Sequence, residues 1–428
     1  MIRHGLIGAA LALAWVAPAP AATPEEVLAL DTRLMLELVR HTPTYSPPVA
    51  SRTFAYVGIA AYEAWASGEA GLVSLAGQLP GLDAVPAREA GALYDEAAVL
   101  QAVNAAMLAA LFANTGPSGQ RAMAAVDARL EASVAARLDP AVLLRSQAYG
   151  EAVAAHVLAW AEGDGGAVID NMGFPREFAR AGTPGAWAPT SAIVQQQAPL
   201  LPLWGGNRAF ALPANAACAV PPPLPYSEEE GSPFRLEAEE VLAIRRGLTD
   251  EQRAVARFWS DDPMLSPTPP GHWVSIADQV LEGEGAERRL EVMALLGVAL
   301  ADGFIACWRD KFEHDTVRPV TYVRAVLDPA FEPLLVTPPF PEYPSGHSSQ
   351  SGAAATVLAA LLGERAFTDR TGEADGLPPR KFPSFWAAAE EAALSRLYGG
   401  IHFRAAVERG LDQGRCVGAF ALSLRTRP

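Results

Sequence analysis

Apolar residues recur every three or four positions in two segments of the N-terminal half, EEVLALDTRLMLELVRH and YDEAAVLQAVNAAMLAALFANTG. This period is typical of amphipathic helices, and this half contains no convincing alternation of period two. The turn residues Asn114-Thr115-Gly116-Pro117 stand where the second segment ends. Residues 22–165 are therefore predicted to form an N-terminal helical region.

Helical spacing resumes in TDEQRAVARFWSDD and continues through GHWVSIADQVLEGEG. The longest helix is expected from Ala286 to about Thr316, and its stretch LEVMALLGVALADGFIACW is apolar almost all round, which predicts burial. Glu291 and Asp302 within it argue against a membrane span. Further helices are expected over residues 348–362, 385–398 and 404–424. The pattern predicts an all-α protein built from helical bundles, with residues 236–428 as the C-terminal bundle.

The segment between these regions, residues 166–235, is rich in Pro and Gly and has no sustained period. A flexible linker is one interpretation. Its aromatic residues instead favour an ordered strap packed across the helices; they include Trp204, Phe210, Tyr226 and Phe234.

The first 21 residues have the pattern of a secretory signal. Arg3 precedes an apolar run, and the small residues Ala19 and Ala21 indicate cleavage after Ala21. The run from residue 6 to 16 is shorter than the ~20 residues of a membrane span. We therefore expect a periplasmic or secreted protein without a stable membrane anchor.

The composition narrows the function classes. The chain has 428 residues, 50% hydrophobic and 19% charged, which excludes a disordered protein. A net charge of −15 argues against nucleic acid as a partner. A homo-oligomer is compatible with the acidic surface, although no residue indicates which face would pair. The three cysteines, Cys218, Cys307 and Cys416, leave two alternatives open, one disulfide or three buried thiols.

The first stretch whose side chains could bind or react with a ligand contains Lys311, one of only two lysines, and Arg318. On a regular helix these residues lie on one face, about 10 Å apart, and Pro319 would end the helix near Arg318. A solvated cationic face is the structural alternative. The very apolar sequence that precedes Lys311 argues against it.

Two further stretches follow. Ser345, Gly346 and His347 open a predicted helix, where free N–H groups attract anions and a histidine can transfer protons. In SRLYGGIH, the two glycines break the helix between Arg396 and His402, so that both side chains can face one site. Separately, these stretches also fit an ordinary serine cap and an ordinary helix joint.

Together, the three stretches indicate an oxyanion site. Burying two arginines, a lysine and two histidines is costly unless an anion neutralises them. Arginine offers planar pairs of donors to oxyanions, and lysine acts as a point charge. The set therefore predicts binding of phosphate or of its analogue vanadate.

The same stretches, Lys-x6-Arg-Pro, Pro-Ser-Gly-His and Ser-Arg-x5-His, resemble the acid phosphatase and vanadium haloperoxidase superfamily, which includes the type 2 phosphatidic acid phosphatases. All three occur in the expected order. The wider sequence from about residue 30 to the end, including ADGFIACWRDK and PPFPEYPSGH, is more similar to the exported bacterial vanadium-dependent haloperoxidases. The resemblance implies helical bundles of the phosphatidic acid phosphatase/haloperoxidase type.

The resemblance also implies roles for individual residues. His347 would be the acid–base group, and His402 would bond to vanadium, or attack phosphorus in a phosphatase. Vanadate would be the cofactor, with phosphate as a competing oxyanion, and the partners would be hydrogen peroxide, a halide and a small organic acceptor. The implied oxyanion-binding residues are Lys311, which also counts as catalytic, with Arg318, Ser345, Gly346 and Arg396.

Two features bear on the choice of halide. Trp308 and Phe340 resemble aromatic positions near the halide site of chloroperoxidase-type members, although both also fit a hydrophobic core. Many members have an acid four residues after the metal-bound histidine, where this chain has Ala406. Asp302 or Asp315 is then expected to replace it as the partner of Arg396 or His402.

Three functions follow as hypotheses. The first is a vanadate-dependent haloperoxidase that oxidises halide with hydrogen peroxide to a hypohalous species. The second is a phosphomonoesterase that forms a phosphohistidine at His402, with His347 protonating the leaving group. The third is a protein that only binds an oxyanion.

The remaining histidines are given lesser roles. His314 is a candidate modulator beside the oxyanion site, and His272 is interpreted as structural rather than as a pocket residue. His41 and His156 are also interpreted as structural.

Overall fold

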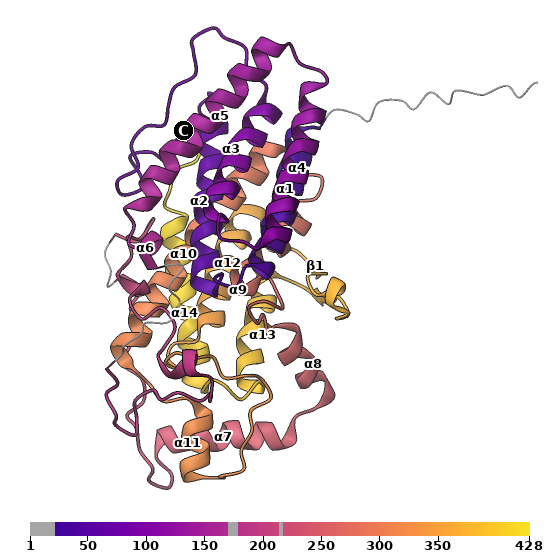
Figure 1. The fold of residues 1–428 in the computed structure, drawn as a ribbon. Helices are drawn as coiled ribbons and strands as arrows, with labels where there is room; N and C mark the ends of the chain where they lie inside the picture. The colour runs from indigo at the N-terminus through magenta and orange to yellow at the C-terminus, as the bar shows by residue number, and fades with distance from the viewer. Residues whose placement is uncertain (1–21, 170–178, 214–216) are drawn as a thin grey trace, which may run out of the picture.

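The structure, a computed structural model, describes residues 22–169, 179–213 and 217–428. The predicted export signal lies outside these residues. Figure 1 shows an elongated molecule of long helices, with the N-terminal helices in the upper half and α7 and α11 at the lower end. The N-terminal helices are α1 (Pro24–His41), α2 (Pro47–Ala66), α3 (Glu96–Leu111), α4 (Pro117–Ala135), α5 (Pro140–Glu162) and α6 (Gly166–Ile169).

The C-terminal half is also helical, which confirms the predicted all-α class. Its helices are α7 (Pro233–Gly247), α8 (Asp250–Phe258), α9 (Thr268–Val280), α10 (Ala286–His314), α11 (Pro319–Val326), α12 (Gly346–Leu362), α13 (Phe385–Tyr398) and α14 (Arg404–Ala421). The 3-10 turns are η1 (Val194–Gln197), η2 (Trp204–Gly206) and η3 (Glu373–Asp375). Two short strands that the sequence analysis did not predict, β1 (Phe367–Asp369) and β2 (Arg380–Phe382), pair antiparallel.

Helix α10 is the central element. It packs against α2, α9, α12 and α14, and one hydrophobic core continues through the N-terminal and C-terminal helices. Among the described helices, it is the one that is long and apolar enough to cross a membrane, but 94% of its most apolar window is buried inside the protein. This burial agrees with a core helix, as the apolar pattern predicted.

Helix α10 ends earlier than expected. Asp315 adopts a left-handed conformation (φ 43°), so the last helical residue is His314. Arg318 then serves as the N-cap of α11, whose first residue is Pro319. The prediction that Lys311 and Arg318 share one face of a helix is therefore wrong, because the chain turns between them and Pro319 begins a helix.

Helices α12 and α14 approach each other closely. A Cβ atom on Gly414 would lie 2.3 Å from the carbonyl oxygen of Ser349, and one on Gly410 would lie 2.7 Å from that of Ser345. Only glycine fits at such distances. The glycines of α14 thus allow α14 to lie directly against the N-terminal end of α12.

The described part of the Pro/Gly-rich segment packs into the core. Trp204 and Phe210 are 1% and 2% exposed. The Asp302 carboxylate on α10 accepts hydrogen bonds of 2.7–3.0 Å from three successive N–H groups of the segment, at residues 210–212. A disulfide joins Cys218 to Cys416 on α14. Cys307 is a buried free thiol, so the one-disulfide alternative holds.

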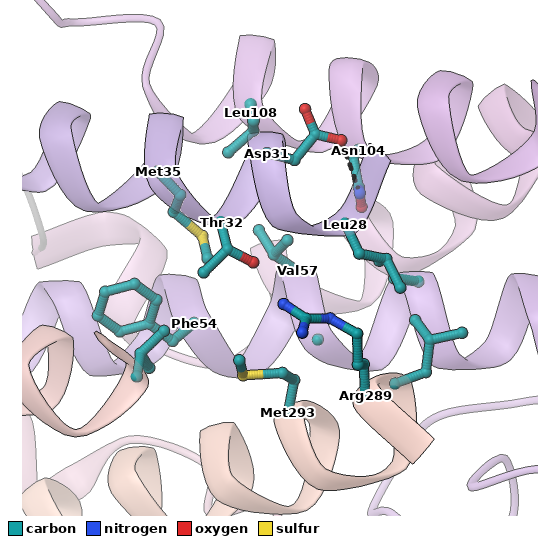
Figure 2. Close-up of a pocket in the computed structure, with 14 residues that line it drawn as sticks. Leu28, Asp31, Thr32, Met35, Phe54, Val57, Asn104, Leu108, Arg289 and Met293 are labelled. Carbon is teal, nitrogen blue, oxygen red and sulfur yellow. Dashed lines mark hydrogen bonds between the residues drawn. The ribbon is translucent and has the colours of Figure 1, made fainter. Parts of the chain in front are cut away.

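A small cavity of about 50 Å³ lies between α1, α2, α3 and α10, away from the residues singled out by sequence (Figure 2). Its wall is mainly apolar. On one side, the Asn104 amide donates a 2.9 Å hydrogen bond to the Asp31 carboxyl. Burial, together with the nearby charge of Asp127, raises the pKa of Asp31 to about 7.

This cavity leads to a stability prediction. Because the pKa of Asp31 is raised from 3.8 to about 7 on folding, the folded protein retains a proton that the unfolded chain loses, and stability falls as pH rises through this interval. This difference between the pKa values of Asp31 in the folded and unfolded states corresponds to about 4 kcal/mol of unfolding free energy. Asp31→Asn removes this penalty, so the variant is expected to melt a few degrees higher than wild type at about pH 8. Thermal unfolding at about pH 4 is the control, where the gain should vanish. An equal Tm difference at both pH values would contradict the assignment.

Candidate active site

A cavity of about 440 Å³ opens where the strap, the loops before α9 and α12, and the end of α13 meet. Gly346, His347, Arg396 and His402, four of the residues predicted from the sequence, line it. Lys311, Arg318 and Ser345 are fully buried, and their hydrogen bonds place them directly behind this lining. The structure therefore brings the three sequence stretches to one site.

The N-terminal end of α12 forms one side of the cavity. Ser345 is the N-cap and accepts the Ser348 N–H, and its own N–H donates to the carbonyl of Ala406 on α14. The N–H groups of Gly346 and His347 lie in the first turn, where no intrahelical carbonyl is available. A Cβ atom on Gly346 would point towards the rings of Phe304 and Trp308, 3.4 and 3.7 Å away, and its absence leaves the backbone open to a ligand on this side.

The two arginines have unused donors. Arg318 donates to the carbonyls of Phe340 (2.8 Å) and Ile401 (3.0 Å), but its Nη2 has no partner among the residues that the structure describes. Arg396 donates from Nη1 to the Trp259 carbonyl at 2.7 Å, and its Nε likewise finds no partner in the described part of the chain. Burial lowers the pKa of Arg318 to about 9 and that of Arg396 to about 10. Both groups remain cationic at neutral pH, so a bound anion would satisfy their free donors.

Lys311 is placed differently. Its ammonium donates to three carbonyls of the segment that precedes α12, those of Pro341 (2.9 Å), Glu342 (2.9 Å) and Pro344 (2.6 Å). An ammonium has three donors, so all are occupied. Burial lowers the pKa of Lys311 to about 7. In this structure, Lys311 stabilises the wall of the oxyanion site instead of pointing into the cavity.

His402 is held from both sides of its ring. Nδ1 lies 2.8 Å from Glu342 Oε1, and Nε2 lies 3.1 Å from Arg318 Nη1. Burial and the charge of Arg318 lower the pKa of His402 well below its usual value. The neutral ring therefore carries its proton on Nδ1, where it donates to Glu342, and Nε2 keeps a lone pair that faces a guanidinium.

Glu342 is the acidic partner that the sequence analysis missed. Its Oε1 also accepts the Phe403 N–H at 2.9 Å, and burial raises the pKa of Glu342 to about 7. The expectation of Asp302 or Asp315 in this role is wrong, because Asp302 accepts N–H groups of the strap and Asp315 caps α10. Glu342 is the one acid within PPFPEYPSGH, three residues before Ser345, which is the signal that could have identified it.

Aromatic rings form part of the cavity wall. Trp308 and Phe340 both line the cavity, with their ring centroids 4.8 Å apart. The Trp308 indole donates to the Leu200 carbonyl of the strap at 3.2 Å. The Phe340 ring lies under two cations, 5.2 Å from the Lys311 ammonium and 5.0 Å from the Arg318 guanidinium. These aromatic rings shield the buried cations from water.

The remaining histidines lie away from the cavity lining. His314 packs edge-on against the Tyr343 ring. His156 bonds to the Asp83 carbonyl, and His41 is an exposed partner of Glu37. His272 is buried between Asp261 and Asp369.

The site as a whole fits a tetrahedral oxyanion such as vanadate. Two buried guanidinium donors without partners, Arg318 Nη2 and Arg396 Nε, occur beside the N-terminal end of α12. A vanadium atom would take the lone pair of His402 Nε2, which faces Arg318 Nη1 in this structure. An oxyanion of high negative charge would compensate the otherwise unpaired cations.

Comparisons with known proteins agree with this geometry. The model of the second helical-bundle domain of vanadium chloroperoxidase matches residues 291–427. Vanadium chloroperoxidase of Curvularia inaequalis is 24% identical over 217 residues, and the match covers 36% of this chain and 36% of that protein. The chain thus covers about a third of the length of that relative.

Solved structures extend the similarity over the whole fold. A bacterial vanadium-dependent iodoperoxidase superposes with a TM-score of 0.87 and 36% identity, covering 94% of this chain and 97% of that one. A holo bacterial vanadium-dependent chloroperoxidase, 17% identical, shares the fold with a TM-score of 0.68 over 90% and 93% of the two chains. Given the extent and identity of the iodoperoxidase match, the chain belongs to the vanadium-dependent haloperoxidase family.

Proposed function

We propose that this protein is a vanadate-dependent haloperoxidase that uses hydrogen peroxide to oxidise iodide to a hypohalous species. The observation that carries the proposal is the neutral His402, whose Nε2 lone pair lies among buried arginine donors without partners. The similarity to an iodoperoxidase supports the choice of halide.

Each residue of the oxyanion site has its own role in this proposal. Bound vanadate supplies a Lewis acid that activates peroxide towards halide attack. His402 would hold it through Nε2, while Arg318, Arg396 and the N–H groups of α12 neutralise negative charge. Glu342 keeps the His402 proton on Nδ1.

His347 is positioned to move protons. Burial and the charge of Arg396 lower the pKa of His347 to about 4, so the ring is uncharged at neutral pH and accepts a proton from incoming peroxide. The developing imidazolium faces the Asp261 carboxylate, 3.5 Å away.

A small organic acceptor is part of the proposal. Leu265 and Val336, at the mouth of the cavity, are 70% and 77% exposed. Such exposed apolar side chains offer a surface on which an apolar acceptor can meet the oxidised halogen.

Export to the periplasm or the medium is likewise proposed. The pattern of residues 1–21 supports it, and a disulfide between Cys218 and Cys416 suits an oxidising compartment. Fractionation of cells that produce the full chain, followed by sequencing of the N-terminus, tests this point. A full-length chain found only in the cytoplasm would overturn it.

The activity is tested with protein beginning at Ala22 and loaded with orthovanadate. We expect peroxide-dependent oxidation of iodide faster than of bromide, and of bromide faster than of chloride. Hydrolysis of an aryl phosphate by the vanadate-free protein is measured in parallel. Phosphate hydrolysis without halide turnover would overturn the proposal and favour a phosphomonoesterase. No activity in either assay would also overturn it and favour oxyanion binding alone.

A further inference from the structure

A second buried polar cluster lies beside the oxyanion site. His272 on α9 is 2% exposed and is placed between two carboxylates. Its Nδ1 lies 2.8 Å from Asp261 Oδ1, and its Nε2 lies 2.8 Å from Asp369 Oδ2. The Trp259 ring stacks on the imidazole, with centroids 4.3 Å apart. Of this cluster, the roles described above use only Asp261, as the carboxylate that faces His347.

The geometry fixes the charge of His272. Both ring nitrogens face carboxylate oxygens at hydrogen-bond distance, so both must carry protons to satisfy their partners. Burial alone would favour the neutral ring, but Asp261 and Asp369 outweigh it and raise the pKa of His272 to about 10. His272 is therefore an imidazolium at neutral pH, unlike His347 and His402.

Asp261 connects this imidazolium to the active site. One of its oxygens, Oδ1, accepts from His272, while Oδ2 has no hydrogen-bond partner within residues 22–169, 179–213 and 217–428 and lies 3.5 Å from His347 Nε2. Asp261 and His347 both line the cavity. The distance is longer than a normal hydrogen bond, as is common for catalytic pairs before substrate binds.

The backbone at Asp261 needs support. Asp261 has φ 50°, a left-handed conformation that costs a non-glycine residue free energy. Met264 in the same loop and Thr268, the first residue of α9, also have positive φ angles. Such a conformation persists when neighbouring contacts determine it, and the hydrogen bond to His272 is one of these contacts.

We propose that His272, itself held by Asp369, is a positioning residue that fixes the Asp261 carboxylate opposite His347 and so orients the acid–base ring towards the cavity. With Nε2 facing Asp261, Nδ1 is the His347 nitrogen left for proton exchange with peroxide. Besides Asp261 and His272, the charged or titratable groups that act on His347 are Arg396 at the end of α13 and His402, and both of these line the same cavity. The inference rests on the proposed function for its catalytic consequence, but its structural part does not.

The first test needs no substitution. Nitrogen NMR of the histidine rings in the vanadate-free protein should show His272 protonated on both nitrogens at neutral pH. A neutral His272 ring at that pH would overturn the proposal. This measurement does not depend on whether the protein oxidises halides.

The second test is His272→Gln, which removes the charge but keeps a polar side chain. We expect kcat for iodide oxidation to fall about tenfold, a fraction of the effect of a general acid–base group. The affinity of the vanadate-free protein for inorganic phosphate, measured by calorimetry, should change less than about twofold, since His272 does not contact the oxyanion site. The ring signals of His347 should shift. His156→Gln on α5 is the matched control and should change none of these quantities.

A double variant at His272 and His347 distinguishes a positioning role of His272 from a general loss of structure. In a His347→Ala background, His272→Gln is expected to cause no further loss of kcat, because its effect is transmitted through His347. If the reductions in kcat caused by His272→Gln and His347→Ala multiply in the double variant, or if His272→Gln also weakens phosphate binding, the proposal is overturned. If His272→Gln does not fold, Asp369→Asn serves as the second variant and should reduce kcat in the same direction. A shift of the His347 signals in a protein without halide turnover would leave the positioning intact and refute the proposed function instead.

Discussion

Replacing His402 by alanine is expected to abolish peroxide-dependent halide oxidation, with kcat falling at least about 1,000-fold, as for residues at a reacting centre. The reason is geometric. His402 Nε2 offers a neutral nitrogen lone pair in the oxyanion site, and Glu342 and Arg318 orient the ring. Steady-state assays of the vanadate-loaded variant measure the loss.

The matched control for this prediction is His41→Ala. His41 is 60% exposed at the end of α1, so its removal should leave the rate unchanged. The arginines remain in His402→Ala, and the variant should still bind inorganic phosphate in calorimetry. Turnover above about one tenth of the wild-type rate would refute the assignment of His402 as the residue that holds vanadate.

Glu342→Gln has the second largest expected effect. Loss of the carboxylate behind a metal-bound histidine typically costs 10–100-fold in affinity, so the vanadate dissociation constant should rise by about that factor. The glutamine retains an oxygen that can accept from His402 Nδ1 and from the Phe403 N–H, and the fold is expected to persist. Titration of activity against vanadate concentration measures the change.

The pH dependence provides an independent check on Glu342. Because burial raises the pKa of Glu342 to about 7, the carboxylate is charged above that pH and increasingly protonated below it. The difference in vanadate affinity between wild type and Glu342→Gln should be full at about pH 8 and shrink towards about pH 6. A difference that is constant over this range would indicate that the charge of Glu342 is not responsible.

Much of the fold could be predicted from the sequence because helix signals are local. The helical pattern predicted residues 385–398 as they occur in α13, and it predicted α12 and α14 to within a few residues. Two errors arose where tertiary structure decides. The left-handed Asp315 ends α10 early, and the pairing of β1 with β2 depends on residues 11–15 positions apart in a Pro- and Gly-containing stretch.

The site was predictable to the extent that its residues cluster in short motifs. The motifs located the cavity, but they do not indicate which residues far apart in the sequence pair by hydrogen bonds. Glu342 lies 60 residues from His402, and Asp369 lies 97 residues from His272. The direction of the Lys311 ammonium also depends on a loop 30–33 residues away. Such contacts depend on how the helices pack.

The burial of Lys311 has a practical consequence for chemical labelling. The chain contains two lysines, and Lys311 is fully buried with all its donors bonded, whereas Lys381 in β2 is exposed. Lys381 does not line the catalytic cavity. Apart from the terminal amine, an amine-reactive dye or a solid support would therefore attach to the native protein at a single side chain.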